Sequence, residues 1–332
     1  MGTWGDILNE LNKILSSGQL KPGDPHPIDA IRRKYLGRVC ELTKRNAILY
    51  ATRWTLPPAA DPDLLSITTE DLQGFMEVTQ DLTGENLDII LHSPGGSAEA
   101  TEGLVKFLRT KFSNIRIIVP HAAMSAATMF CCAANRILMA SHSFLGPIDP
   151  QFVMQTDLGR SAVAAHAILA QFDLAKKECT DATLLPAWLP MLRQYGPALL
   201  VQCQLAQALS QQLVAEWLEA YMLVGYRDAK ERASKTATLL ADHAKFKSHG
   251  RFIDRTEGRG LGLEIDDLET NAKLYAAVLG VYHATTHTFN SSIAVKMIEN
   301  QNGKAFIKQQ QIVQLQAIAM AQPQPPVKPP GT

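Results

Sequence analysis

Several features that would direct a functional assignment are absent from this chain of 332 residues. It has 32 basic and 32 acidic residues, so its formal net charge is zero and nothing favours binding to nucleic acid or an anionic membrane. Its five cysteines have no CxxC spacing, which argues against a disulfide framework or zinc site and fits a reducing cytoplasm. Nucleotide and metalloprotease motifs (GxxxxGKS/T, HExxH) are also lacking, so we expect no cofactor and no metal.

Long uncharged segments are scarce. Residues 117–134 carry no charged side chain, but the segment contains Pro120 and many alanines, and Arg116 and Arg136 flank it closely. This favours a buried strand followed by a small-residue helix over a membrane span. The first residues lack the basic start and apolar core of a signal peptide. Residues 4–15 predict an amphipathic helix whose polar face is not basic. Membrane association therefore stays possible without a clear transmembrane segment, and we expect a cytoplasmic protein.

What the chain does contain is ordinary globular composition, with 46% apolar and 19% charged residues. Apolar strand patterns at residues 46–52, 87–92 and 116–120 alternate with helical patterns. That alternation predicts an α/β fold with a parallel sheet and crossover helices. From residue 159 onward the periodicity becomes helical, with sections expected at 162–177 and 187–222.

Two strand-to-helix turns carry the chemistry. After the strand at 87–92, the turn SPGG contains Gly95 and Gly96, whose backbone N–H groups can face a negatively charged oxygen. After the strand at 116–120, Ser125 opens a small-residue helix with the Ala126 amide beside it, an arrangement suited to acyl transfer. A right-handed crossover would bring both turns to one sheet edge. The alternatives are a simple turn at Gly95 and Gly96 and an ordinary helix N-cap at Ser125.

The segments LHSPGGSAEA, VPHAAMSAATM and SFLGPIDPQ together resemble the serine dehydrogenase proteinase family, a branch of the Clp/crotonase-fold serine peptidases related to signal peptide peptidase A. The resemblance covers roughly residues 4–290 and is densest over 87–151. It implies a ClpP/crotonase-like spiral of βαβ units with a helical C-terminal half, a peptide or protein substrate, and a homo-oligomer. It also implies that Ser125 is the nucleophile, with oxyanion-hole amides from Gly96 and Ala126 next to Gly95. The expected substrate-binding residues are Ser97, Met124, Gly146 and Pro147.

With this resemblance, the chain divides into four expected parts. Residues 1–45 form an N-terminal helical segment, and residues 46–158 form the ClpP/crotonase-like catalytic core. Residues 159–290 form a helical extension that completes the core and provides oligomer contacts. Residues 291–332 form a Gln/Pro-rich tail that is expected to be partly disordered, or to dock a partner's aromatic groove.

The base that would activate Ser125 stays open. The signal peptide peptidase branch uses a lysine downstream of the serine, which points to Lys176 or Lys177. A lysine must be buried to act as a base, however, and a solvated helix face is the simpler interpretation of these two residues. The other candidate is a Ser125–His249–Asp149 triad in which His and Asp exchange their usual segments. His142 is a further candidate.

Two other functions also remain open. A crotonase-type acyl-CoA enzyme would share the sheet and the glycine-rich oxyanion site, but it would need no serine at position 125. A catalytically inactive scaffold or adaptor would keep the fold and bind partners through its helical part or its tail.

Overall fold

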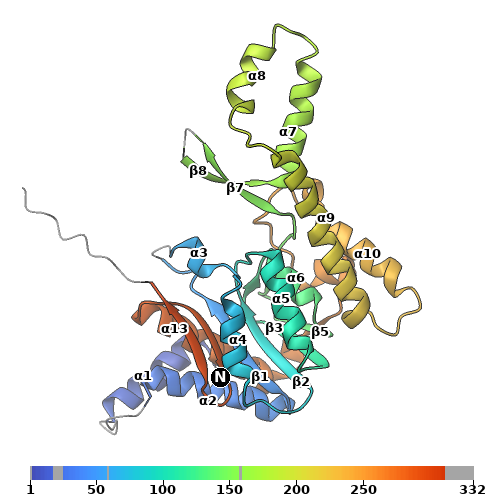
Figure 1. Ribbon diagram of the computed structural model, residues 1–332. Helices are drawn as coiled ribbons and strands as arrows, with labels where there is room; N and C mark the ends of the chain where they lie inside the picture. The colour runs from blue at the N-terminus through green and yellow to red at the C-terminus, as the bar shows by residue number, and fades with distance from the viewer. Residues whose placement is uncertain (1, 18–24, 58–59, 157–158, 311–332) are drawn as a thin grey trace, which may run out of the picture.

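A seven-stranded sheet lies at the centre of the molecule (Figure 1). The structure is a computed structural model and describes residues 2–17, 25–57, 60–156 and 159–310. The strands, in spatial order, are β11 (Ala305–Gln309), β10 (Ala294–Asn300), β1 (Asn46–Thr52), β2 (Asn86–His92), β3 (Asn114–Val119), β5 (Arg136–Met139) and β9 (Ile265–Asp267). Strands β1, β2, β3, β5 and β9 are parallel, while β10 and β11 are antiparallel to their neighbours. The predicted α/β class is therefore confirmed.

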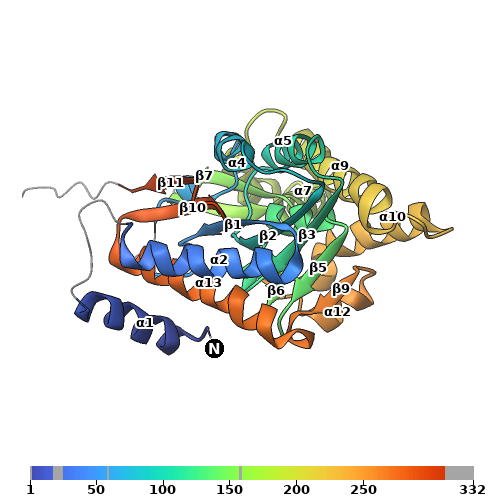
Figure 2. The same cartoon turned by 90° about the horizontal axis from the view of Figure 1, so that it is seen from below.

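Helices cover both faces of this sheet, as the nearly continuous apolar sequences of β1 and β2 require. One face packs against α4 (Asp71–Thr79), α5 (Ala98–Arg109), α6 (Ala126–Cys132) and α9 (Leu199–Trp217). The other packs against α2 (Pro27–Thr43) and α13 (Ala272–Ser291), and α1 (Trp4–Ser16) lies outside these two helices. Figure 2 shows α2 and α13 on one side of the strands and α4 and α5 on the other.

Shorter elements connect these layers. Strand β4 (Ala122–Ala123) pairs with β6 (Phe144–Leu145) beside the main sheet. The connecting helices are α3 (Pro62–Leu65), the π-helical turn η1 (Leu218–Met222), α10 (Ala229–Leu240), α11 (His243–Phe246), α12 (Arg255–Gly260) and the 3₁₀ turn η2 (Leu268–Thr270). In the described parts of the chain, no helix combines the length and apolar character needed to cross a bilayer.

An arm extends away from the sheet layers (Figure 1). It consists of the hairpin β7 (Gln151–Thr156) and β8 (Gly159–Ala164), followed by α7 (Ala165–Glu178) and α8 (Leu185–Leu192). The helix expected at 162–177 therefore starts later, because residues 159–164 pair as a strand. The section expected as helical over 187–222 is interrupted between α8 and α9, where Gly196 and Pro197 precede the left-handed Ala198.

The boundary expected at residue 291 for the tail is wrong. Residues 296–300 of strand β10 pair with β1, and all seven residues of the strand are buried; β11 then adds the sheet edge. The tail looked polar because β10 contains Lys296, Glu299 and Asn300, whose side chains are buried with hydrogen-bonding partners. The Pro-rich end, residues 311–332, lies outside the described residues, and so do the predictions of its disorder and docking.

Candidate active site

The two predicted turns meet at the carboxyl end of the parallel strands, as a right-handed crossover requires. The Ser93 N–H donates to the Ala122 carbonyl at 3.2 Å, and the Met124 N–H donates to the Ser93 carbonyl at 3.0 Å. This pairing brings Gly95 against Ser125. A Cβ at Gly95, which has φ +99°, would lie 2.7 Å from the Ser125 Cβ and 2.5 Å from the Met124 carbonyl oxygen. Only glycine fits at this contact.

The backbone of Ser125 has an uncommon conformation, with φ 52° and ψ −123°. The other non-glycine residues with positive φ in the described chain, Lys44, Ala198 and Lys247, have ψ between −7° and 35° and are ordinary left-handed helix-end residues. Ser125 lies in the N-cap position of α6, yet its side chain makes no capping hydrogen bond. A sharp strained turn that exposes an unengaged hydroxyl at a helix start is the geometry of a nucleophile elbow.

Two backbone amides are available next to this hydroxyl. Ala126 is the first residue of α6, a position whose N–H has no acceptor within its own helix. Among the described residues, the Gly96 N–H likewise donates to no protein acceptor, although the flanking Gly95 and Ser97 amides both do. These amides are therefore suited to receive an oxyanion, as their positions in the sequence suggested.

Asp149 joins two histidines on the other side of the site. Its Oδ1 is 2.8 Å from His249 Nδ1 and its Oδ2 is 2.9 Å from His243 Nδ1, while Gln151 Nε2 donates to Oδ2 at 3.1 Å. The Asp149 side chain is only 2% exposed. Burial raises the pKa of this carboxyl, but the hydrogen bonds and charges of His249 and His243 outweigh burial and lower the pKa overall. An ionised Asp149 therefore fixes a hydrogen on His249 Nδ1, which leaves Nε2 as the basic nitrogen.

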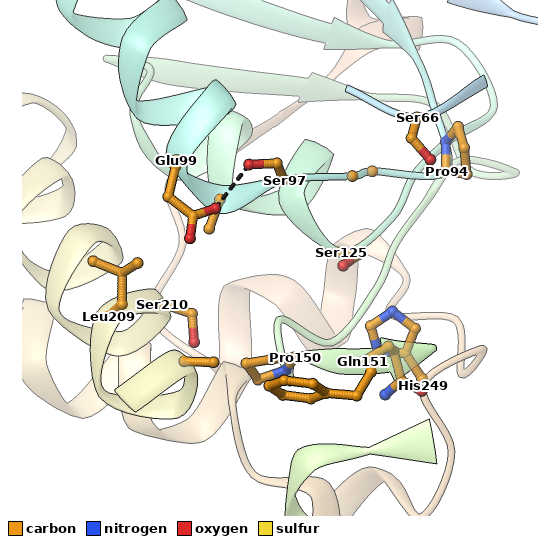
Figure 3. Close-up of a pocket in the computed structure, with 15 residues that line it drawn as sticks. Ser66, Pro94, Ser97, Glu99, Ser125, Pro150, Gln151, Leu209, Ser210 and His249 are labelled. Atoms are coloured by element: carbon orange, nitrogen blue, oxygen red, sulfur yellow. Dashed lines mark hydrogen bonds between the residues drawn. The ribbon is translucent and has the colours of Figure 1, made fainter. Parts of the chain in front are cut away.

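Ser125 and His249 line the same cavity, which has a volume of about 360 Å³. Figure 3 shows the His249 ring next to Ser125, with Pro94 and Ser97 of the glycine-containing turn on the other side. The two side chains are not hydrogen-bonded to each other in this structure, a common feature of catalytic pairs without substrate. The remaining lining residues are Ser66, Gly95, Gly96, Ala98, Glu99, Pro150, Gln151, Phe152, Ala206, Leu209 and Ser210.

The predicted substrate-binding residues lie in different places. Ser97 lines the cavity, and its hydroxyl caps α5 by accepting from the Ala100 N–H at 3.0 Å. Met124, Gly146 and Pro147 are buried beside the cavity and do not line it. The Gly146 N–H donates to Thr128 Oγ1 at 3.0 Å, which holds that loop in the interior.

The lysine candidates lie outside the cavity. Lys176 and Lys177 are exposed on α7, and Lys176 lies 3.6 Å from Asp173, another exposed side chain. Neither lysine is buried, and burial is what would keep a lysine in the neutral form that can accept a proton. His142 also lies outside the lining, and its Nε2 is 3.0 Å from the Pro120 carbonyl oxygen.

Sequence reasoning missed His243. The only available signal was that His243 and His249 stand six residues apart in DHAKFKSHG, on either side of the turn that follows α11. Their convergence on one carboxylate depends on a contact about a hundred residues away along the chain. In the described part of the structure, no group of three or more His, Cys, Asp or Glu side chains is arranged to hold a metal ion.

Comparison with known proteins finds a family that is similar to the part of the chain around Ser125. Residues 67–187 match the family of ClpP-like SDH-type serine proteinases. The match covers 121 of the 332 residues and makes this segment similar to that family. The matched segment includes Ser125, both turn glycines and Asp149, as well as Lys176 and Lys177, but it ends before His249.

Individual relatives match only parts of this chain. Two uncharacterized proteins of Methanocaldococcus jannaschii are each 37% identical, one over 86 residues and the other over 121. The matches span 26% and 36% of this chain, and 30% and 38% of the relatives. A solved mutant of a membrane-bound stomatin-specific protease is 17% identical with a TM-score of 0.36, covering 63% of this chain and 79% of that one. A TM-score of this size does not establish a shared fold.

Proposed function

We propose that this chain is a serine peptidase that hydrolyses peptide bonds through an acyl-enzyme on Ser125. The observation that carries the proposal is the strained, uncapped Ser125, which shares a cavity with a histidine bonded to a buried carboxylate. A helix cap would not require this backbone conformation, and a crotonase-type acyl-CoA enzyme would need no nucleophile there. The similarity of residues 67–187 to ClpP-like SDH-type serine proteinases supports the same reaction class.

In the proposed mechanism, His249 Nε2 takes the proton of Ser125 as the Oγ attacks the substrate carbonyl. The Gly96 and Ala126 amides donate to the oxyanion of the tetrahedral intermediate. His249 then gives its proton to the leaving amine, and a water activated by the same imidazole releases the acyl group. Asp149 keeps the Nδ1 hydrogen in place and stabilises the imidazolium that forms in each half-reaction.

We favour His249 over the lysines because of contacts and exposure. His249 already has an orienting carboxylate at 2.8 Å and lines the cavity of Ser125. Lys176 and Lys177 are solvent-exposed on the arm and do not line that cavity. A lysine base on this chain would require the arm to move against Ser125.

The test is covalent labelling with a fluorophosphonate probe, followed by mass spectrometry of the modified peptide. We expect labelling at Ser125 that disappears in Ser125→Ala and falls by at least 100-fold in rate in His249→Ala. Lys176→Ala and Lys177→Ala serve as matched controls and should label at the wild-type rate. Loss of labelling in a lysine variant, with labelling kept in His249→Ala, would instead identify a Ser–Lys dyad.

A second measurement separates the other functions. The folded wild-type protein should hydrolyse a mixture of unstructured peptides, and Ser125→Ala should not. Acyl-CoA turnover that survives Ser125→Ala would indicate a crotonase-type enzyme. Absence of both labelling and hydrolysis in folded wild-type protein would indicate a scaffold.

We also propose that the arm joins a second copy of the chain in a homo-oligomer. None of the eight residues of α8 is buried within the chain, none is charged, and Leu185, Leu189 and Met191 are each about 40% exposed. A helix of this composition is stabilised by covering its apolar side chains. Leu189→Glu should lower the mass measured by analytical ultracentrifugation, whereas Val224→Glu, at an exposed apolar residue outside the arm, should not. An unchanged mass in Leu189→Glu would argue against an interface on α8.

A further inference from the structure

A buried charge pair lies behind the glycine-containing turn. Lys296 of β10 and Asp71 at the start of α4 both have fully buried side chains, and Lys296 Nζ lies 2.8 Å and 2.9 Å from the two carboxylate oxygens. The Tyr50 hydroxyl donates to Asp71 Oδ2 at 2.9 Å. Neither charged residue lines the cavity. Buried ion pairs contribute little net stability because the cost of desolvation offsets their attraction. We therefore ask which neighbouring groups this pair holds in position.

The pair holds both ends of a three-residue segment. Lys296 Nζ donates to the Ser66 carbonyl at 2.6 Å, and Asp71 Oδ2 accepts from the Thr68 N–H at 2.9 Å. Ile67 lies between these two anchored residues and is itself buried. Ser66 is part of the cavity lining, next to Pro94 in Figure 3. The charge pair therefore fixes the backbone on each side of Ile67.

Ile67 in turn pairs with the glycine-containing turn as a short parallel bridge. Its N–H donates to the Gly95 carbonyl at 2.7 Å, and its carbonyl accepts from the Ser97 N–H at 3.0 Å. The approach is close, because a Cβ on Gly96 would lie 2.3 Å from the Ile67 nitrogen. The turn is thus held between Ile67 on one side and Ser125 on the other.

This pairing determines where the Gly96 N–H points. The Gly95 carbonyl and the Gly96 N–H belong to one planar trans peptide, so they point in opposite directions. Since the Gly95 carbonyl points at Ile67, the Gly96 N–H points away from Ile67, to the side of the turn where Ser125 lies. A rotation of this peptide would remove the amide from an oxyanion formed at Ser125.

We propose that Lys296 and Asp71 are positioning residues that aim the Gly96 oxyanion donor by anchoring residues 66–68. This inference rests on the proposed peptidase function. Neither side chain touches the substrate, so the effect of losing the pair should appear in the transition state and leave substrate binding largely unchanged.

The experiment compares hydrolysis of an acyl ester with hydrolysis of the matching thionoester. A developing thiolate sulfur accepts hydrogen bonds poorly, so an aligned oxyanion hole favours the oxygen ester. In Lys296→Met we expect kcat for the oxygen ester to fall about 10- to 100-fold, while KM stays within about 2-fold of the wild-type value. The ratio of kcat for the oxygen ester to kcat for the thionoester should fall by a similar factor.

The matched control is Glu299→Gln on the same strand. Glu299 is also fully buried and pairs with Arg32 and Arg33, but it makes no contact with residues 66–68. It should lower stability while leaving kcat and the ester preference at wild-type values. If Lys296→Met does not fold, Tyr50→Phe removes one hydrogen bond from Asp71 and should change both readouts in the same direction to a smaller extent.

The outcomes separate this inference from the proposed function. A wild-type protein that neither labels at Ser125 nor hydrolyses the ester would contradict the peptidase proposal itself. An active wild type whose folded Lys296→Met variant keeps both its kcat and its ester preference would overturn the positioning role alone. An equal loss in Glu299→Gln would overturn it too, since the effect would then come from general destabilisation.

Discussion

The backbone at Ser125 should cost stability, and a glycine at this position should recover part of that cost. A non-glycine residue in such a sparsely populated region costs about 1–3 kcal/mol, and φ 52° with ψ −123° is a conformation that glycine adopts freely. Ser125→Ala keeps the Cβ and its strain, whereas Ser125→Gly removes both. Relative to Ser125→Ala, the glycine variant loses about 0.4–1 kcal/mol of free energy of unfolding because its unfolded chain is more flexible. It loses about 0.4 kcal/mol more because a half-buried methyl group is missing.

With about 2 kcal/mol as the middle of the strain range, Ser125→Gly should exceed Ser125→Ala in free energy of unfolding by about 1 kcal/mol. Urea titration followed by tryptophan fluorescence measures this difference directly, and both variants lack the hydroxyl, so its chemistry cancels. Gly103→Ala in α5, where an added Cβ meets no atom within 4 Å, calibrates the usual gain from alanine. If Ser125→Gly is less stable than Ser125→Ala, the backbone at Ser125 is not strained and the nucleophile-elbow assignment loses its main support.

Three further perturbations test other parts of the site and its surroundings. Gly95→Ala should reduce probe labelling at least 100-fold, because its Cβ would lie 2.5 Å from the Met124 carbonyl oxygen; labelling at the wild-type rate would refute this packing. Asp149→Asn should lower kcat by about 10³–10⁴ with a smaller change in KM, and a change below 10-fold would show that the carboxylate does not orient His249. Burial, followed by the charge of His121, lowers the pKa of His92 to about 3 in the folded protein. Below about pH 6.5 this imidazole is therefore protonated in the unfolded chain while it is still neutral in the folded one. The free energy of unfolding should therefore decrease as the pH falls from about 6.5 to about 3, by up to about 5 kcal/mol for this group. In urea titrations at a series of pH values, His92→Phe should show a smaller decrease. An equal dependence on pH in the two proteins would contradict the lowered pKa of His92.

The parallel part of the sheet was predictable because its information is local. The strand expected at residues 46–52 is β1 with the same bounds, and the strand expected at 87–92 differs from β2 by one residue. Each is a short apolar run between turn residues, and a crossover helix between parallel strands has a fixed hand. These local features are enough to predict that Gly96 and Ser125 lie at one edge of the sheet.

The remaining features depend on partners far away in the sequence. Strand β10 carries Lys296 and Glu299, whose residue types are typical of a protein surface. Their burial depends on the ion pairs with Asp71 and Arg32, which lie far away in the sequence. The hairpin of β7 and β8 was hidden in a segment whose pattern also fits the start of a helix. The sequence left lysine and histidine open as the proposed base because burial distinguishes the candidates, and burial is a property of the folded chain.

The return of the chain through β10 has a consequence for biosynthesis. Strand β1 gains its antiparallel neighbour only after about residue 300 has been synthesised. The ion pairs of Arg32 with Glu299 and of Asp71 with Lys296 cannot form before then. All of the residues proposed for chemistry precede this strand. A nascent chain would thus contain Ser125, Asp149 and His249 before the ion pair that anchors residues 66–68 is complete.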